Sequence, residues 1–420
     1  MGSESGTKHL ASDLIERGQL EICDGYRAKN SEMASDGLPF VRVANVNNGI
    51  QTDNIDLLGW PSVKRAGTKV ARPGDVVFTA KGTVGRHAFV TKSIPKFVYS
   101  PQLCYWRSLD PEFLVPRFLY YWIQGHEFTM QSSAVKGQTD MADYVSLTDM
   151  RRMRITVPDP SEQRRIAHIL GTLDDKIELN RRTNETMEAM ARVLFKSWFV
   201  DFDPVRAKAA GRQPKGMDAD TATLFPDSFE ESELGVIPKG WRATTWGNLV
   251  ELAYGKALRD YKSSSGPVQV FGTNGPIGWT DRPLSNEPTV IIGRKGAYRG
   301  VHFASGPSWT IDTAFFVRPN KSMQIRWAYY AIRQHDINEM DSGSAIPSTS
   351  RNAFYALGGI EPSSEVQDAF QRILRPIWEK QAHNTSEAEH LGGVRYFLLP
   401  RLLSGELADT GAEPATEATG

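Results

Sequence analysis

The chain has 420 residues, of which 40% are hydrophobic and 23% charged, a composition typical of a globular protein with two or three domains. It contains neither a run of 18 apolar residues nor a signal-peptide pattern, so we expect a cytoplasmic protein without a transmembrane helix. Its two cysteines, Cys23 and Cys104, are too few for a disulfide framework or a metal cluster.

The net charge is zero, with 49 basic and 49 acidic residues, but the charges are unevenly distributed. Residues 216–235 contain six acidic side chains and no basic one, and residues 406–420 contain four acidic side chains and no basic one. The rest of the chain therefore carries ten more bases than acids. Neutrality of the whole chain does not exclude a nucleic-acid partner.

Residues 20–157 consist mainly of short β-rich segments bounded by Gly, Pro and Asn, which predicts strands joined by turns. A short helix is expected before them at 9–17. Residues 113–128 are rich in aromatic side chains and predict one short helix that belongs to the core. We expect a polar loop at 136–149 and then a strand at 155–157.

Residues 161–199 predict one long helix, because they hold no proline and a single glycine, Gly171. Their apolar residues recur at alternate steps of three and four, the spacing of a helix that packs lengthwise against a partner. Asp159, Pro160 and Glu162 before and within its first turn form a helix-start pattern. At 1.5 Å per residue, about 40 residues make a rod roughly 60 Å long.

Residues 206–240 have the character of a linker, because they combine several prolines with the acidic run. The strand-rich pattern then returns at 241–361, again with an aromatic helix, here at 325–334. Matching residues relate the two halves: Lys81-Gly82 to Lys295-Gly296, Tyr120-Tyr121 to Tyr329-Tyr330, and Pro158 to Pro362. The sequence therefore predicts an internal duplication.

A second long helix is predicted near the other end of the chain, because the apolar spacing of the first reappears after a shift of 204 residues. That shift places Asn180 on Asn384, and a polar Asn in a helical seam is a device for fixing register. The alternative is that any two amphipathic helices share such a pattern. Pro376 lies inside the second helix and should kink or split it. The residues expected to join the two helices are Ile166, Ile169, Leu173, Asn180, Met187, Leu194, Phe370, Ile373, Ile377, Asn384, Leu391 and Leu398.

These elements predict an α+β fold, with two mixed α/β domains separated by two long antiparallel coiled-coil helices and related by a pseudo-two-fold repeat. Two similar globules held apart by a rod suit the reading of two half-sites on a DNA duplex. The expected divisions are domains at 1–158 and 241–361, long helices at 159–205 and 362–407, a linker at 206–240 and a disordered acidic tail at 408–420.

Several segments resemble a known family. VFGTNGPIGWT (270–280), TVIIGRKGAYRG (289–300) and WTIDTAFFV (309–317) in the second half, with LPFVRVANVNNG (38–49) and GDVVFTAKGTVGR (74–86) in the first, are similar to target recognition domains of type I restriction–modification specificity subunits. SEQRRIAHILGTLDDKIELNRR (161–182), VLFKSWFVDFDPVRAK (193–208) and LLPRLLSGEL (398–407) resemble the helical regions of that family.

The resemblance implies a DNA-reading subunit without a catalytic centre. Such a subunit positions two adenine methyltransferase subunits, and recruited restriction subunits that carry the motor and nuclease, on a bipartite asymmetric sequence of double-stranded DNA. We expect no cofactor and no metal in this chain, and S-adenosylmethionine in the methyltransferase partner. The alternatives are a stand-alone DNA methyltransferase or nuclease with an unrecognised centre, and a structural scaffold. Against an enzyme, the sequence has no Asn-Pro-Pro or Asp-Pro-Pro tetrapeptide of the adenine-methyltransferase type and no Gly-x4-Gly-Lys-Ser/Thr loop.

The candidate DNA contacts lie in turns where glycine allows the backbone to approach phosphates closely. The basic candidates are Lys81, Arg86, Arg294, Lys295 and Arg299. The polar loop residues suited to base edges are Gln102, Lys136, Gln138, Thr273, Asn274, Ser344, Ser348 and Arg351. The alternative for the basic residues is a solvated surface charge, and for the polar residues a plain loop role.

Overall fold

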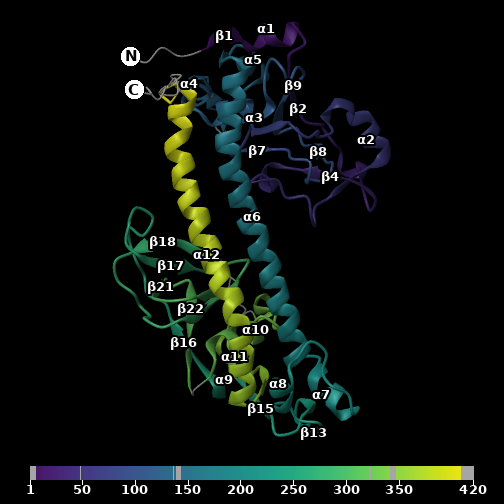
Figure 1. Ribbon diagram of the computed structural model, residues 1–420, viewed down its shortest axis with the longest axis vertical. Coiled ribbons are helices and arrows are strands. Elements are labelled where there is room, and N and C mark those ends of the chain that lie inside the picture. The colour runs from purple at the N-terminus through teal and green to yellow at the C-terminus, as the bar shows by residue number, and fades with distance from the viewer. Residues whose placement is uncertain are drawn as a thin grey trace, which may run out of the picture. The chain divides into compact units, whose positions relative to one another are not determined.

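The computed structural model describes residues 6–47, 49–135, 137–138, 143–320, 323–340 and 347–407, with the backbone alone at 137–138. The chain divides into two compact units: unit 1 is Met1–Arg181 with Thr385–Gly420, and unit 2 is Arg182–Asn384. Two 40-residue helices, α6 (Pro160–Phe199) and α12 (Ser364–Leu403), each contribute one part to each unit. Figure 1 shows α6 in teal and α12 in yellow.

Unit 1 contains two four-stranded sheets, with strand orders β2-β9-β6-β7 and β3-β5-β4-β8, and two-stranded pairs β1-β12 and β10-β11. Its strands are β1 (Thr7–Leu10), β2 (Leu20–Asp24), β3 (Met33–Ala34), β4 (Gly37–Val41), β5 (Leu57–Gly59), β6 (Val76–Thr79), β7 (His87–Phe89), β8 (Val98–Tyr99), β9 (Leu103–Ser108), β10 (Gly137–Gln138), β11 (Asp143–Tyr144) and β12 (Arg154–Val157). Besides its part of the long helices it holds α1 (Ala11–Glu16), α2 (Trp60–Ala66), α3 (Pro116–Gln124), α4 (His126–Ala134) and α5 (Leu147–Arg151).

Unit 2 contains a four-stranded sheet of order β16-β22-β19-β20, a three-stranded sheet of order β18-β17-β21, and pairs β13-β14 and β15-β23. Its strands are β13 (Phe229–Ser232), β14 (Gly235–Pro238), β15 (Arg242–Thr245), β16 (Val250–Tyr254), β17 (Val268–Gly272), β18 (Gly275–Thr280), β19 (Thr289–Gly293), β20 (Val301–Ala304), β21 (Ser308–Thr310), β22 (Ala314–Pro319) and β23 (Gly358–Glu361). Its shorter helices are α7 (Asp203–Ala209), α8 (Ala219–Thr223), α9 (Trp246–Leu249), α10 (Ile325–Ile332) and α11 (Arg351–Ala356).

The two units repeat one topology, as the internal duplication predicts. The order β2-β9-β6-β7 in unit 1 matches β16-β22-β19-β20 in unit 2, and all neighbours in both sheets are antiparallel. Each unit also has one parallel pair, β4-β8 and β17-β21 respectively. In both units an aromatic helix, α3 or α10, packs against this four-stranded sheet.

Each long helix has a glutamine in its first turn that connects it to the start of the aromatic helix of its unit. Gln163 accepts from the Val115 backbone N–H at 2.9 Å and donates to the Phe113 carbonyl at 2.9 Å. Gln367 occupies the equivalent place in α12 and accepts from the Gln324 backbone N–H at 3.1 Å. These amides satisfy backbone groups at the start of α3 and α10, where a helix leaves its first N–H groups without intrahelical partners.

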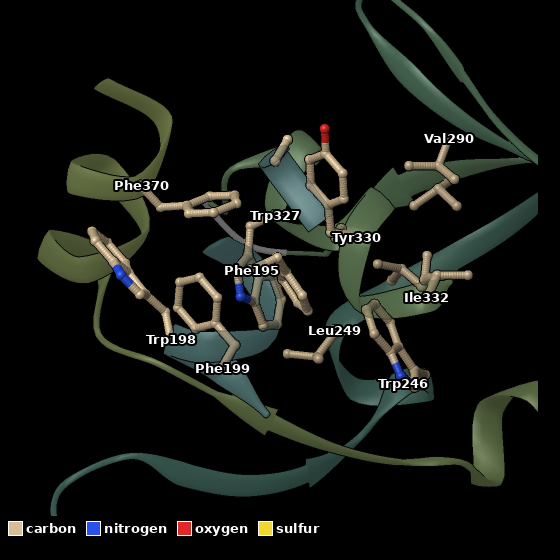
Figure 2. Packing of buried hydrophobic residues seen from close by; sticks show 14 of the residues in the cluster. Phe195, Trp198, Phe199, Trp246, Leu249, Val290, Trp327, Tyr330, Ile332 and Phe370 are labelled. Carbon is tan, nitrogen blue, oxygen red and sulfur yellow. The ribbon is translucent and has the colours of Figure 1, made fainter. Parts of the chain in front are cut away.

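The core of unit 2 is aromatic, as Figure 2 shows. Phe195 and Phe199 of α6 lie with ring centroids 5.8 and 5.2 Å from that of Phe370 in α12, and Tyr330 of α10 lies 6.0 Å from the same ring. Phe370 is fully buried. The two long helices therefore pack through aromatic side chains at this end of unit 2, with α10 against them.

The core of unit 1 includes one buried ion pair. The Arg107 guanidinium donates to both carboxylate oxygens of Asp75, at 2.6 and 2.8 Å, and the Tyr99 hydroxyl donates to the same carboxylate at 2.7 Å. Asp75 is fully buried. A buried charge needs such a full set of partners, which indicates a structural role for this pair.

The long helices run antiparallel in each unit and meet at polar seam positions. In unit 1, Asp174 pairs with Arg395 at 2.8 Å, and the Asn180 side chain donates to Glu387 at 2.8 Å. In unit 2, the Asn384 side chain donates to the Asn184 side-chain oxygen at 2.9 Å. Asn180 and Asn384 are both buried, as the spacing of the two helices predicts.

The structure corrects two expectations about α12, the burial of Ile373 and a split at Pro376. Ile373 is 39% exposed, and its neighbour Leu374 is buried instead. Pro376 does not split the helix, which runs unbroken through it. Pro376 and Arg372 both lie on the exposed face, so water can satisfy the Arg372 carbonyl that the missing proline N–H leaves without a partner.

Three other segments also differ from expectation. Residues 113–128 form two helices separated by Gly125, where a Cβ atom would meet Leu403 at 2.6 Å. The expected loop at 136–149 contains β10, β11 and the start of α5. The expected linker at 206–240 contains α8 and the β13-β14 hairpin, and buries Phe225 and Ile237. The prolines there separate short elements, and the acidic residues lie on the solvent-exposed face of these elements.

Among the described helices, none has a stretch apolar and long enough to cross a membrane.

Candidate nucleic-acid interface

In unit 2 the candidate residues gather where β19 ends. The Arg294 and Lys295 backbone N–H groups both donate to the Thr313 carbonyl, at 2.9 and 3.1 Å. The Thr273 hydroxyl donates to the Lys295 and Thr313 carbonyls, at 2.8 Å each. The Lys295 side chain is exposed on this fixed backbone. Thr273 therefore holds the turn, and Lys295 is available to a partner.

The loop before α11 closes the same turn from the other side. The Thr349 backbone N–H donates to the Arg294 carbonyl at 2.8 Å, and the Gly296 N–H donates to the Pro347 carbonyl at 3.0 Å. Lys295 and Ser348 form an isolated β-bridge. Gly296 has a φ of +125°, a backbone conformation that residues other than glycine rarely adopt.

Unit 1 repeats this arrangement at Lys81. The Val145 backbone N–H donates to the Ala80 carbonyl at 2.9 Å, the Gly82 N–H donates to the Asp143 carbonyl at 3.1 Å, and Lys81 bridges Tyr144. Lys81 is exposed. In both units, therefore, a Lys-Gly turn at the end of a central strand is held by the loop that precedes a short helix, α5 or α11.

The surroundings of the two lysines differ. In unit 2, the guanidinium carbons of Arg294 and Arg351 lie 4.9 and 5.0 Å from the centroid of the Tyr254 ring. Arg351 also donates to the Tyr355 hydroxyl at 3.1 Å. The position equivalent to Arg294 in unit 1 is Ala80, which precedes Lys81 as Arg294 precedes Lys295. The cation–π cluster of Tyr254, Arg294 and Arg351 thus distinguishes unit 2 from unit 1 at this place.

Arg299 does not belong to this surface. It is only 4% exposed, and its guanidinium donates to the Asn338 carbonyl at 2.8 Å and the Gly296 carbonyl at 3.2 Å. Its backbone N–H donates to the Asn338 side chain at 2.8 Å. Arg299 therefore fixes the loop from Gly296 to Gly300 to the segment after α10, and the expectation that it contacts DNA is corrected.

The remaining candidates are placed as follows. Arg86 is half-buried and donates to the Val46 carbonyl at 3.3 Å, so part of its guanidinium supports a neighbouring loop. Gln102 and Asn274 have exposed side chains. Lys136 and Ser344 lie outside the described residues, and Gln138 is described in its backbone only.

Two side chains near Lys295 were not among the candidates. Tyr298 is 81% exposed, in the same loop as Lys295, and its place between Gly296 and Gly300 is a signal that the sequence offered. His302 lies beneath the Thr273 turn, where a Cβ atom on Gly275 would meet its ring at 3.3 Å. Burial lowers the pKa of His302, which favours a neutral ring under the turn.

The described residues contain no group of three or more His, Cys, Asp or Glu side chains arranged to hold a metal ion. The arrangement at the two lysines is instead one of exposed cations and polar groups on rigid turns. Such an arrangement can bind phosphates through lysine and present polar and aromatic side chains to bases.

Comparisons with known proteins agree on one family. A family model described as the type I restriction modification DNA specificity domain matches residues 20–189. The type I restriction enzyme HindI specificity subunit of Haemophilus influenzae is 25% identical over 406 residues, covering 81% of this chain and 88% of the relative. The type I restriction enzyme MjaIX specificity subunit of Methanocaldococcus jannaschii is 20% identical over 377 residues, covering 82% and 80%.

The fold agrees as well. The type I restriction–modification S subunit from M. genitalium matches with a TM-score of 0.57 at 17% identity, over 95% of this chain and 96% of that one. The expected fold class, α+β with an internal repeat and two long antiparallel helices, is confirmed. Residues 20–189 therefore match the type I restriction modification DNA specificity domain, and most of the chain is similar to type I restriction–modification specificity subunits.

Proposed function

We propose that this chain is the non-catalytic DNA sequence-specificity subunit of a type I restriction–modification complex. The observation that carries the proposal is the repeated Lys-Gly turn, at Lys81 in unit 1 and Lys295 in unit 2, each fixed by backbone hydrogen bonds to the loop before a short helix. One repeated scaffold with different side chains around it suits the reading of two different half-sites. The recognised site is therefore bipartite and asymmetric.

Within each unit we assign different tasks to the exposed side chains. Lys81 and Lys295 contact phosphates, because a lysine on a fixed backbone supplies charge and register without sequence information. Gln102 and Asn274 are exposed amides suited to base edges, and Arg351 contributes to specificity with Tyr254 and Arg294. Thr273 and Ser348 hold the turn that carries Lys295.

The chemistry of the complex resides in its partners. Adenine methyltransferase subunits, which bind S-adenosylmethionine, and restriction subunits act on the DNA that this chain selects. This chain contributes the positions of the two recognition surfaces and no reacting group.

A methylation assay tests this proposal. The purified chain, incubated with duplex DNA and labelled S-adenosylmethionine, is expected to transfer no methyl group, whereas addition of its methyltransferase subunit produces methylation at one bipartite sequence. Methyl transfer or DNA cleavage by the chain alone favours a stand-alone enzyme. Methylation without sequence preference in the assembled complex favours a structural scaffold.

A further inference from the structure

Two arginines occupy the same place in the two units but differ in what they bind. Arg117 is the second residue of α3 and Arg326 the second residue of α10. Each lies against a phenylalanine at the third position of an edge strand, with the guanidinium carbon 5.7 Å from the Phe89 ring centroid in unit 1 and 4.3 Å from the Phe303 ring centroid in unit 2. The two sites are therefore internal equivalents.

In unit 1 the guanidinium is occupied by a carboxylate. Arg117 donates to both oxygens of Asp175 in α6, at 2.7 and 3.1 Å, and to the Gly171 carbonyl at 3.2 Å. A Cβ atom on Gly171 would lie 2.9 Å from the Arg117 side chain, so glycine is needed for this approach. Burial lowers the pKa of Arg117 and the Asp175 carboxylate raises it, with a net upward shift.

In unit 2 the equivalent positions of α12 carry different residues. The shift of 204 residues places Arg375 at the position of Gly171, Trp378 at that of Asp174 and Glu379 at that of Asp175. The Trp378 ring also packs against Arg326, with its centroid 4.2 Å from the guanidinium carbon. No hydrogen bond or ion pair to the Arg326 side chain occurs among the residues that the structure describes. Burial lowers the pKa of Arg326, the opposite of the shift at Arg117.

A pocket opens beside this arginine. It has a volume of about 380 Å³ and is lined by Arg326 together with Phe303, Ile325, Arg375, Trp378 and Glu379, among others. Two aromatic rings, those of Phe303 and Trp378, therefore pack against the guanidinium, and its N–H groups have no hydrogen-bond acceptor among the described residues. A planar edge of N–H groups matches a carboxylate in bidentate geometry.

The pocket and the candidate nucleic-acid surface of unit 2 lie at opposite ends of strand β19. Pro288, which lines the pocket, precedes β19, whereas Arg294 and Lys295 follow it. The five residues of β19 separate Pro288 from Arg294, and these six residue steps span about 20 Å at roughly 3.3 Å per residue. DNA bound at Lys295 is therefore a poor source for the occupant, and a polypeptide is the better one.

We propose that the pocket beside Arg326 binds the carboxylate of an aspartate or glutamate side chain presented by a partner polypeptide. Unit 1 identifies the ligand, because the equivalent arginine takes a carboxylate from its own chain. Arg375 at the rim adds a second positive charge, and Glu379 lies exposed at the rim. The identity of the partner as a methyltransferase or restriction subunit rests on the proposed function, whereas the carboxylate chemistry does not.

Fluorine NMR of the full chain labelled with 5-fluorotryptophan tests the ligand class. The Trp378 signal is assigned by its absence in Trp378→Phe. We expect N-acetyl-glutamate N-methylamide to shift this signal saturably, and the glutamine analogue to leave it unchanged. The response is lost in Arg326→Gln, whose other tryptophan signals report on folding, and is retained in Arg375→Gln. No saturable shift, an equal response to the glutamine analogue, or a stronger response to inorganic phosphate overturns the proposal.

A second measurement tests the partner. In the complex with the methyltransferase subunit and the restriction subunit, Arg326→Glu should weaken association with one of them by about 30-fold or more, as expected for the loss of one member of a desolvated charge pair. Unchanged affinity for both subunits overturns the polypeptide occupant, even where the small carboxylate binds. If the complex that contains the wild-type chain shows no sequence-specific methylation, the proposed function is contradicted instead. The failure of the pocket proposal and the failure of the proposed function are therefore distinguishable.

Discussion

Lys81 and Lys295 each carry an exposed side chain on a turn that backbone hydrogen bonds fix. In unit 1 the neighbours Ala80 and Gly82 make these bonds, and in unit 2 the Lys295 N–H itself takes part. Fixing the backbone limits the conformational entropy that ordering the lysine side chain costs when DNA binds. Each lysine that neutralises one phosphate also releases counterions from the duplex. At this scale the structure predicts a salt-dependent, sequence-independent contribution from each unit.

Replacing Lys295 by alanine should therefore weaken DNA binding by the assembled complex to a similar extent on all sequences. The slope of log K against log salt concentration should fall by about 1, the value for one lost phosphate contact. Lys239 is the matched control, because it is also an exposed lysine of unit 2 but follows the β13-β14 hairpin. An unchanged slope in Lys295→Ala, measured by titration from low to high salt, removes this residue from the interface.

Arg299 shows what a sequence can and cannot predict about single residues. Glycines around it correctly indicate a tight turn, as they do for Lys295. The partners that bury Arg299, however, are groups of Asn338 and Ile337, about 40 residues further along the chain. Side-chain direction within a loop depends on such distant carbonyl groups, and local composition carries no information about them.

At the scale of elements, the seam of α12 separates two apolar side chains that the periodicity treats alike. Phe370 is fully buried among the aromatic rings of α6 and α10, whereas Ile373 is 39% exposed. The buried positions were predicted by alternate steps of three and four residues, which is a repeat of 3.5 residues. A helix has 3.6 residues per turn, so the predicted positions rotate gradually away from the buried face. The pattern therefore predicted the helix and its buried asparagines well, and individual seam members less well.

Phe370→Ala should consequently destabilise unit 2 by about 3–5 kcal/mol, the typical cost of removing a buried phenylalanine. Ile373→Ala is the matched control and should change stability by less than about 1 kcal/mol, since surface substitutions have small effects. Hydrogen exchange of the α10 amides reports the local free energy of opening in each variant. Equal protection of α10 in the two variants contradicts the packing shown in Figure 2.

The whole molecule combines one duplicated scaffold with two different surfaces. The duplication was predictable from sequence because it repeats turn and helix residues, such as Lys81-Gly82 and Pro158, at nearly constant offsets. The difference between the two surfaces was not predictable from sequence, because it arises from pairs of side chains that folding brings together. Tyr254 meets Arg351 across almost 100 residues of chain, and Arg326 meets Trp378 across about 50. Motifs and periodicities describe residues that are close in sequence, so they cannot predict these pairs.

Because the two turns are built and held separately within their units, their recognition should also be separable. Exchanging residues 20–157 for the corresponding segment of another specificity subunit should change one half-site of the methylated sequence and leave the other unchanged. The exchange keeps α6 and α12 intact, so association with the methyltransferase subunit should persist. Sequencing of modified bases in DNA methylated by the reconstituted complex reads out both half-sites together. A change in both half-sites, with the complex still assembled, would show that the lysine turn of unit 2 does not recognise its half-site independently of unit 1.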